Sequence, residues 1–173
     1  MLNLKGKSAL VTGGSKGIGL AIARRLARAG ANVAICGRSE AALATALDDL
    51  RREFPPDTLK LVTLPADVRS EDAVRKLFLA VDHEFGGLDI LVNNAGVGIF
   101  KDLASIEPEE WKMVIDTNLT GAYLCSHEAL PRFRARGGGW IVNIASLASK
   151  NSFAGGAAYN ASKFGLLGFS EAT

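Results

Sequence analysis

The 173-residue sequence has little of what several classes of protein depend on. It contains only two cysteines, Cys36 and Cys125, and two histidines, His83 and His127, with no C-x-x-C spacing. This shortage argues against a disulfide framework and against a zinc site, so no metal is expected. Lysine and arginine together number 20 against 18 acidic residues. The resulting net charge of +2 gives no reason to expect nucleic acid or an anionic membrane as a partner.

Long apolar runs are missing as well. No stretch approaches the roughly eighteen uninterrupted apolar residues of a membrane span. The residues from Met1 to Lys7 lack the apolar segment of a signal peptide. Apolar residues nevertheless make up 48% of the chain and charged residues 22%, values typical of globular domains. We therefore expect one soluble domain over residues 1–173, in the reducing environment of the cytoplasm.

Short apolar runs alternate with amphipathic stretches along the chain, which predicts alternating strands and helices. Gly30, Pro55-Pro56 and Gly86-Gly87 are typical of helix ends, whereas Pro131 leaves the end of the longest helix undetermined. The predicted strands cover residues 8–12, 32–36, 58–64, 88–92 and 140–145. The predicted helices cover residues 18–29, 40–53, 71–85, 108 to beyond 130, and 157 toward 173.

Short strands that alternate five times with helices indicate a parallel sheet covered on both faces. Right-handed crossovers then make it a doubly wound α/β sheet. This pattern predicts a fold class and by itself names no function.

A glycine-rich turn joins the first strand to the first helix, with the sequence Thr12-Gly13-Gly14-Ser15-Lys16-Gly17-Ile18-Gly19. Glycines permit a tight turn and let a phosphate approach the backbone, and the following helix offers free N–H groups. The spacing is G-x-x-x-G-x-G, not the G-x-G-x-x-G of the standard dinucleotide fingerprint. It also lacks the G-K-[ST] ending of a nucleoside-triphosphate loop. Alone, such a turn is equally compatible with a purely structural role.

Three later motifs accompany this turn. Asn93-Asn94-Ala95-Gly96 follows the fourth predicted strand, Ser146 ends the fifth, and Tyr159-x-x-x-Lys163 lies on the last helix. In this order the motifs resemble the short-chain dehydrogenase/reductase family, in its common non-extended branch, over nearly the whole chain. The resemblance implies a Rossmann-type sheet with strand order 3-2-1-4-5 and a nicotinamide dinucleotide as cofactor. Sugar-nucleotide epimerases share Y-x-x-x-K but usually have a different glycine spacing and a longer chain, so they rank lower.

Tyr159 and Lys163 are the first candidates for catalysis. They lie four residues apart and so share one face of a helix. An ammonium beside a phenol favours the phenolate, which suits proton exchange near neutral pH. The resemblance implies that Tyr159 protonates the alkoxide as hydride reaches a carbonyl, and that Lys163 also holds the nicotinamide ribose. The alternative is an aromatic residue and a lysine on an ordinary amphipathic helix.

Ser146 lies at the carboxyl end of a predicted strand, where open α/β sheets bind ligands. Its hydroxyl can donate a hydrogen bond to a substrate carbonyl oxygen. Ser149 and Ser152 lie nearby, and the family's spacing to Tyr159 selects Ser146. The alternative is a serine that caps a helix or belongs to a loop.

Further contacts are implied by the resemblance alone. Asn118 resembles the family asparagine that links Lys163 to solvent through water; otherwise it would be solvated or bonded to backbone. Asn93 would brace the sheet and Asn94 would be the nearer ligand. Asp67 resembles the residue that bonds the adenine amino group, with an ordinary loop or cap residue as the alternative. The cofactor-binding residues implied are Gly13, Ser15, Lys16, Gly17, Ile18, Gly19, Arg38, Asp67, Val68, Asn94, Ala95, Gly96, Tyr159 and Lys163.

The end of the second strand bears on the choice between NAD and NADP. A ribose-binding acid is expected about twenty residues past the glycines, but the sequence there is Cys36-Gly37-Arg38-Ser39. Arg38 can clamp a 2′-phosphate with two hydrogen bonds, and Lys16 can assist as a point charge. The alternative is that both cations are merely solvated. The missing acid favours NADP, with NAD still possible.

Members of this family normally continue beyond the Y-x-x-x-K helix with a sixth and usually a seventh strand. This sequence ends at Thr173, so the resemblance predicts a Rossmann domain that is incomplete at its C-terminus. The fifth strand would then be an exposed apolar edge, which favours self-association into a homo-oligomer. The active site would be open to water, which weakens electrostatic catalysis.

The leading prediction is an NADPH-dependent oxidoreductase that interconverts a carbonyl and a secondary alcohol of a small molecule. Similarity to 3-oxoacyl-carrier-protein reductases points to a 3-oxoacyl thioester as one possible substrate. The rival prediction is a truncated dinucleotide-binding module without catalysis. The two differ in whether NADPH binding is accompanied by turnover.

Overall fold

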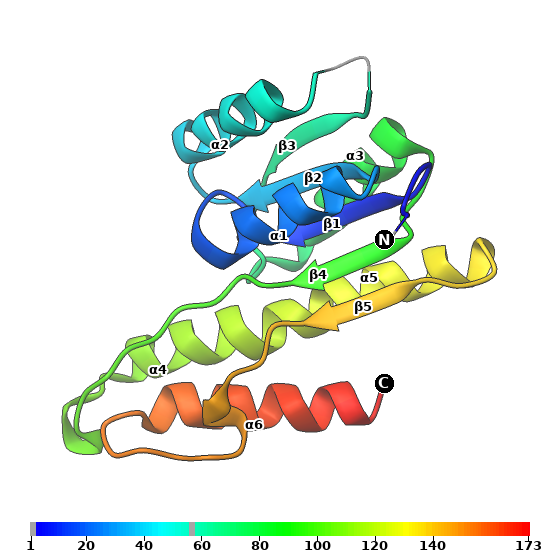
Figure 1. Ribbon diagram of the computed structural model, residues 1–173. Helices are drawn as coiled ribbons and strands as arrows, with labels where there is room; N and C mark the ends of the chain where they lie inside the picture. Colours follow the sequence, from blue (N-terminus) through cyan, green and yellow to red (C-terminus); the bar gives the residue numbers. More distant parts are fainter. Residues whose placement is uncertain (1–2, 56–57) are drawn as a thin grey trace.

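The computed structural model describes residues 3–55 and 58–173 (Figure 1). Five strands form one parallel sheet in the order β3-β2-β1-β4-β5. This order confirms the predicted doubly wound Rossmann-type architecture. The strands are β1 (Ser8–Thr12), β2 (Asn32–Gly37), β3 (Leu61–Pro65), β4 (Ile90–Asn93) and β5 (Trp140–Asn143).

Helices cover both faces of this sheet. Figure 1 shows α1 on the near side of the sheet and α5 behind it, while α6 runs along the outside below β5. The helices are α1 (Gly17–Arg28), α2 (Glu40–Glu53), α3 (Glu71–Phe85), α4 (Pro108–Ile115), α5 (Gly121–Ala135) and α6 (Ala157–Glu171). Three short helical segments are η1 (Leu103–Ser105), η2 (Asp116–Thr120) and η3 (Leu147–Ser149). In the part of the chain described, no helix combines the length and apolar character needed to cross a membrane.

The core divides into two apolar clusters, one on each face of the sheet. Successive side chains of β1 alternate between them, because strand side chains point to opposite faces. Leu10 packs with residues of α3 and α5, whereas Ala9 and Val11 pack with residues of α1 and α2. Every residue of β1 is buried, as expected for the central strand of a parallel sheet.

Local capping explains most of the helix ends. The Ser70 hydroxyl accepts a hydrogen bond from the Ala73 N–H at 3.3 Å and starts α3. Gly86 ends α3 in the left-handed conformation, at φ 70°. Gly30 takes φ 93° just beyond α1. Of the predicted stop at Pro55-Pro56, Pro56 lies outside the described residues.

Three strands are shorter than predicted, among them β4, which covers Ile90–Asn93 instead of residues 88–92. β3 begins at Leu61 instead of residue 58, because the N–H and hydroxyl of Thr58 both donate to the Pro55 carbonyl oxygen in a turn. β5 ends at Asn143 instead of Ala145, because the Ala145 N–H turns back to the Asn143 carbonyl oxygen at 3.0 Å.

The long helix predicted from Pro108 past Leu130 is interrupted in its middle. The π-helical segment η2 separates α4 from α5, and the Gly121 N–H donates to the carbonyl oxygen of Asp116, five residues back. Such segments occur frequently at functional sites, and this one carries Asn118. Pro131 lies on the exposed side of α5, which continues to Ala135.

A buried aspartate joins the amino ends of three strands. Asp89 accepts hydrogen bonds from the backbone N–H of Ser8 at 2.9 Å and from the Ser8 hydroxyl at 3.0 Å. Lys7 Nζ lies 3.1 Å from its carboxylate, and Arg136 Nη2 lies 3.5 Å away. The Trp140 N–H donates to the Asp89 carbonyl oxygen at 2.9 Å. Because Ser8 begins β1, Trp140 begins β5 and Asp89 precedes β4, this network fixes one end of the sheet.

The outer face of β5 carries exposed apolar side chains. β5 pairs with β4 along one edge, and Trp140 and Val142 are 57% and 45% exposed. The expected apolar edge is therefore present in the described structure.

Candidate active site

A cavity of about 920 Å³ opens at the carboxyl ends of the strands. The loops that follow all five strands contribute to its wall, together with the first turns of α6. This is the edge at which open α/β sheets bind ligands. All fourteen residues expected to bind the cofactor line it, namely Gly13, Ser15, Lys16, Gly17, Ile18, Gly19, Arg38, Asp67, Val68, Asn94, Ala95, Gly96, Tyr159 and Lys163.

Gly13 and Gly19, in the turn after β1 and at the start of α1, have no room for a side chain. A Cβ on Gly13 would lie 2.9 Å from the Ala95 Cα, and Gly13 has φ +64°. A Cβ on Gly19 would lie 2.3 Å from the Gly13 carbonyl oxygen and 2.4 Å from Asn94 Nδ2. The turn and the segment after β4 therefore pack backbone against backbone at the start of α1.

Asn94 and Thr12 hold these two segments together. Asn94 Nδ2 donates to the carbonyl oxygens of Thr12 at 2.9 Å and Gly13 at 3.1 Å. The Thr12 hydroxyl oxygen accepts from the N–H groups of Asn94 and Ala95, both at 3.0 Å. The Asn94 amide is thus engaged with the glycine turn while the residue lines the cavity. Thr12 was not among the predicted site residues, although its place just before the glycines was a signal.

Asn93 braces a different part of the sheet. Its Nδ2 lies 2.8 Å from Asn143 Oδ1 on β5 and 3.1 Å from the Ser126 hydroxyl on α5. Asn93 is buried, so this side chain links β4, β5 and α5 from inside the protein.

Replacing Gly19 with alanine tests the close packing of the turn. The new Cβ meets the rigid Gly13 carbonyl, so we expect a loss of about 2 kcal/mol in the free energy of unfolding. NADPH binding should weaken by about tenfold, since the turn must shift. Denaturant titration and fluorescence titration measure the two effects.

Gly168→Ala is the matched control for this substitution. Gly168 lies on the exposed side of α6, and a Cβ there has no neighbour within 4 Å. Alanine should stabilise that helix by about 0.5 kcal/mol and leave NADPH binding unchanged. Equal effects of the two substitutions would contradict the packing argument.

Two positively charged side chains that line the cavity have no ion-pair partner among the described residues. Lys16 and Arg38 are both exposed, and no carboxylate of the described residues lies within 4 Å of either. Arg38 precedes Ser39, which caps the positive N-terminal end of α2. The neighbourhood therefore suits an anionic group.

Asp67 is held as a carboxylate by a neighbour that the sequence analysis missed. Arg69 Nη2 lies 2.6 Å from Asp67 Oδ2, and Arg69 Nε lies 3.0 Å from Oδ1. These hydrogen bonds lower the pKa of Asp67, and the charge of Arg38 adds to the effect. Arg69 also lines the cavity. A cation two residues after Asp67 was the available signal.

Tyr159 and Lys163 lie together on α6. Lys163 Nζ is 5.8 Å from the centre of the Tyr159 ring, as their four-residue spacing predicts. The Lys163 side chain is buried and donates to the Ile144 carbonyl oxygen at 2.7 Å. Burial lowers the pKa of Lys163 below its usual value. The arrangement places an ammonium beside a phenol at the cavity wall.

Ser146 starts the short helix η3. Its hydroxyl oxygen accepts from the Ala148 N–H at 3.1 Å, which leaves the hydroxyl proton free to be donated. Ala145, just before it, lines the cavity. Of the two neighbouring serines, Ser149 is 2% exposed and accepts from the Ser146 N–H, and Ser152 is exposed. Burial thus makes Ser149 a poor alternative.

Asn118 connects the segment after β4 to the helix that carries Tyr159. Its amide exchanges two hydrogen bonds with the backbone of Val97, both at 2.8 Å. Its Nδ2 also donates to the Ser162 hydroxyl at 3.0 Å, and that hydroxyl donates to the Tyr159 carbonyl oxygen at 2.8 Å. Thr117, beside Asn118, lines the cavity. The Asn118 side chain thus fixes Val97, at the cavity wall, relative to the helix that carries Tyr159.

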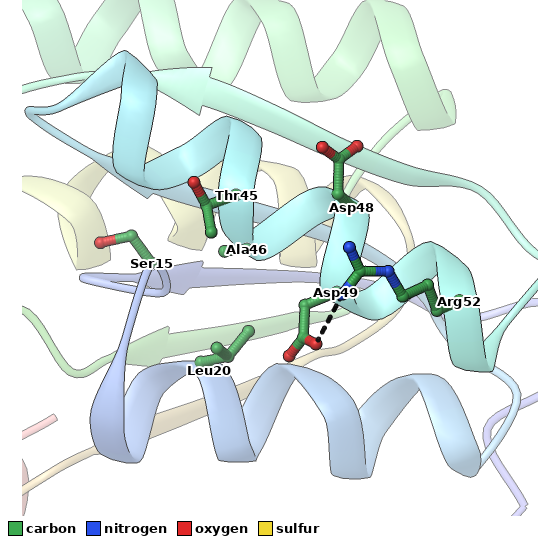
Figure 2. A pocket seen from close by; sticks show the side chains of 7 residues that line it. All are labelled: Ser15, Leu20, Thr45, Ala46, Asp48, Asp49 and Arg52. Atoms are coloured by element: carbon green, nitrogen blue, oxygen red, sulfur yellow. Dashed lines mark ion pairs between the residues drawn. The ribbon is translucent and has the colours of Figure 1, made fainter.

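A smaller cavity of about 210 Å³ lies between α1 and α2, beside the glycine turn. Figure 2 shows Arg52 reaching toward Asp49, with 3.9 Å between Nη1 and Oδ1. Its other lining residues are Ser15, Leu20, Thr45, Ala46 and Asp48. The wall of this cavity carries two carboxylates, Asp48 and Asp49, and one guanidinium, Arg52, so its negative charge disfavours a phosphate.

Among residues 3–55 and 58–173, no group of three His, Cys, Asp or Glu side chains is placed to hold a metal ion.

The fold, the glycine turn and the Tyr159–Lys163 pair together define a Rossmann-type α/β protein with a candidate proton-transfer site. Residues 7–173 match the short chain dehydrogenase family, and the chain belongs to that family. This confirms the resemblance found in the sequence.

Similar proteins include 3-oxoacyl-[acyl-carrier-protein] reductase of Chlamydia muridarum, which is 41% identical over 170 residues. The match covers 98% of this chain and 67% of that protein. A 3beta-hydroxysteroid dehydrogenase of Mediterraneibacter gnavus is 38% identical over 172 residues, which cover 96% of this chain and 59% of that protein. The chain spans about three fifths of the length of several curated relatives that it matches.

A solved structure gives a similar result. A metagenomic short-chain oxidoreductase in complex with NADP has a TM-score of 0.91 and 39% identity. The match covers 98% of this chain and 75% of that protein.

Proposed function

We propose that the protein is an NADP(H)-dependent oxidoreductase that interconverts a carbonyl and a secondary alcohol. The observation that carries this proposal is the shared cavity, which brings Tyr159 and Lys163 together with the glycine turn and two free cations. Membership of the short chain dehydrogenase family supports oxidoreductase chemistry. The NADP complex of a structural relative supports the choice of cofactor.

The residues of the cavity fit a nicotinamide dinucleotide. Gly13 and Gly19 permit the tight turn that leads into the positive end of α1, where free N–H groups suit a phosphate. Asp67 would meet the adenine, Arg38 and Lys16 the ribose phosphate, and Lys163 the nicotinamide ribose. When bound, the cofactor supplies or accepts the hydride at the substrate carbon.

The protein's own residues handle the oxygen and its proton. In reduction, the Tyr159 hydroxyl gives its proton to the substrate oxygen as that oxygen gains charge. Lys163 stabilises the resulting phenolate, and its burial strengthens this interaction. The Ser146 hydroxyl donates a hydrogen bond to the same oxygen. In oxidation, the same groups work in reverse and Tyr159 accepts the proton.

Charge reversal at Arg38 tests the preference for NADP. Arg38→Asp removes a phosphate-binding guanidinium and adds an acid able to bond a ribose hydroxyl. We expect NADPH affinity to fall about thirtyfold and NADH affinity to stay the same or rise. Fluorescence titration with both nucleotides measures the ratio.

Arg51→Asp makes the same change in net charge at an exposed position of α2 outside the cavity lining. It should leave the NADPH to NADH ratio unchanged. If Arg38→Asp also leaves that ratio unchanged, the assignment of Arg38 to the 2′-phosphate is wrong.

Several finer features belong to the same proposal. A 3-oxoacyl thioester is one candidate substrate, supported by the reductase of Chlamydia muridarum. Residues 1–173 would form a single dinucleotide-binding domain. Cys36 and Cys125 are free and buried, which supports a reducing compartment such as the cytoplasm. The exposed Trp140 and Val142 of β5 support association of copies of the chain into a homo-oligomer.

A further inference from the structure

We propose that Phe100 is a substrate-contact residue that selects carbonyl compounds bearing an aromatic ring next to the carbonyl. Phe153 would extend this aromatic surface beyond the cavity. The inference rests on the function proposed above and names a substrate class for it.

Three aromatic rings from two distant parts of the chain meet at the candidate catalytic tyrosine. The Phe100 ring centre lies 5.5 Å from that of Tyr159, with the planes at 67° in an edge-to-face arrangement. It lies 5.8 Å from the ring centre of Phe153. Phe100 and Tyr159 both line the large cavity. Edge-to-face stacking is the geometry in which aromatic rings attract one another.

The two phenylalanines keep much of their surface open despite these contacts. Phe100 is 60% exposed and Phe153 is 46% exposed. Scattered exposed apolar residues are ordinary, but this pair adjoins the Tyr159 ring at the wall of a ligand-sized cavity. A ligand group that covers Phe100 removes apolar surface from water, which favours binding.

Both rings are held in place by their surroundings. A Cβ on Gly98 would lie 2.7 Å from the Phe100 ring, and a Cβ on Gly156 would lie 2.5 Å from the Phe153 ring. Each ring therefore lies directly on a glycine backbone. A surface held in this way loses little side-chain entropy when a ligand binds.

Hydrogen bonds fix the two loops relative to one another. The Lys101 N–H donates to the Gly155 carbonyl oxygen at 2.9 Å. Asn160 Nδ2, next to Tyr159 on α6, donates to the Phe153 carbonyl oxygen at 3.0 Å. The aromatic surface and the candidate reacting group are thus parts of one rigid arrangement.

The charge beside this surface gives no reason to expect a charged substrate group. Lys101, the neighbour of Phe100, is paired with Glu110 on α4. The free cations Lys16 and Arg38 belong to the loops after β1 and β2, whereas Phe100 follows β4. An uncharged flat ring therefore suits Phe100 better than a carboxylate or phosphate.

The test compares two methyl ketones of equal carbon count, acetophenone and the open-chain 2-octanone, with NADPH as reductant. We expect the protein to have the higher kcat/KM for acetophenone. Phe100→Leu keeps an apolar side chain but removes the ring, and should lower kcat/KM for acetophenone about fivefold, through KM. It should change the value for 2-octanone by less than about twofold. Phe100→Tyr should restore the preference.

Phe164→Leu is the control, because Phe164 is a 45% exposed phenylalanine on α6 outside the cavity lining. It should leave both ketones unaffected. Equal losses on both ketones in Phe100→Leu, or no loss on either, would overturn the proposal.

A binding measurement separates this proposal from the proposed function. If neither ketone is reduced, the affinities of 1-phenylethanol and 2-octanol are measured by calorimetry in the presence of NADP, and the oxidoreductase function is tested separately with a 3-oxoacyl thioester. If Phe100→Leu weakens the binding of 1-phenylethanol and leaves that of 2-octanol unchanged, the aromatic site is still supported. Unchanged affinities, or no binding of either alcohol, would overturn it.

Discussion

Replacing Tyr159 with phenylalanine is expected to lower kcat for carbonyl reduction by about a thousandfold. The substitution removes only the hydroxyl that would transfer the proton. The ring stays in contact with Phe100, and Lys163 keeps its hydrogen bond to the Ile144 carbonyl oxygen. NADPH affinity should therefore change by less than about twofold. Steady-state kinetics and a fluorescence titration measure the two quantities.

The chain offers a matched control, since its other tyrosine is Tyr123. Tyr123 lies on α5, is 48% exposed and is not part of the cavity lining. Tyr123→Phe should leave kcat unchanged. Full turnover in Tyr159→Phe would mean that the proton comes from another group. NADPH binding without turnover in the unmodified protein would favour the rival prediction of a non-catalytic dinucleotide-binding module.

Replacing Asp89 with alanine is expected to lower the free energy of unfolding by about 3 kcal/mol. The substitution leaves the buried N–H of Ser8 without its acceptor, whereas the Ser8 hydroxyl keeps the Gly87 carbonyl oxygen at 2.7 Å. It also leaves Lys7 and Arg136 without a counter-charge, although both reach solvent. Chemical denaturation near neutral pH measures the loss.

The effect of this substitution should depend on pH. Burial alone would raise the pKa of Asp89, but hydrogen bonds from Ser8 and Lys7 and the charge of Arg136 lower it overall. A carboxyl whose pKa is lower in the folded protein stabilises it fully above the unfolded value of about 4. That contribution is lost as pH falls through the lowered value. The stability difference between the unmodified protein and Asp89→Ala should therefore shrink in acid.

Asp72→Ala serves as the control, because the Asp72 side chain is 80% exposed in the first turn of α3. It should cost less than about 1 kcal/mol. A difference for Asp89→Ala that is the same at neutral pH and at about pH 3 would contradict the assigned role of the carboxylate.

The strands could be predicted from the sequence because their signals are local, whereas the strand order was implied by the family resemblance. β1 has the predicted bounds because the short run Ser8–Thr12, apolar at its centre, stops before Gly13-Gly14. The π-helical segment η2 could not be predicted, since helical periodicity continues across it and its cause lies in packing. Asn118 there bonds Val97, which is distant in sequence.

Site residues that belong to a sequence motif could be predicted. Residues whose role depends on contacts made in the folded protein could not. The spacing of Tyr159 and Lys163 placed them on one helix face, as the structure has them. The pairing of Arg69 with Asp67 depends on side-chain conformations. The exposure of Phe100 depends on the fold of two distant loops. Neither property follows from hydrophobic periodicity.

The Asp89 network and the cavity lie at opposite ends of the same strands. Substitutions at well-separated positions usually have additive effects on stability. The loops that line the cavity can therefore change in evolution without weakening the Asp89 network at the other end of the strands. Mutations at the cavity that alter substrate choice therefore leave the stability contributed by the Asp89 network in place. This separation makes the scaffold tolerant of new chemistry and a good starting point for laboratory evolution.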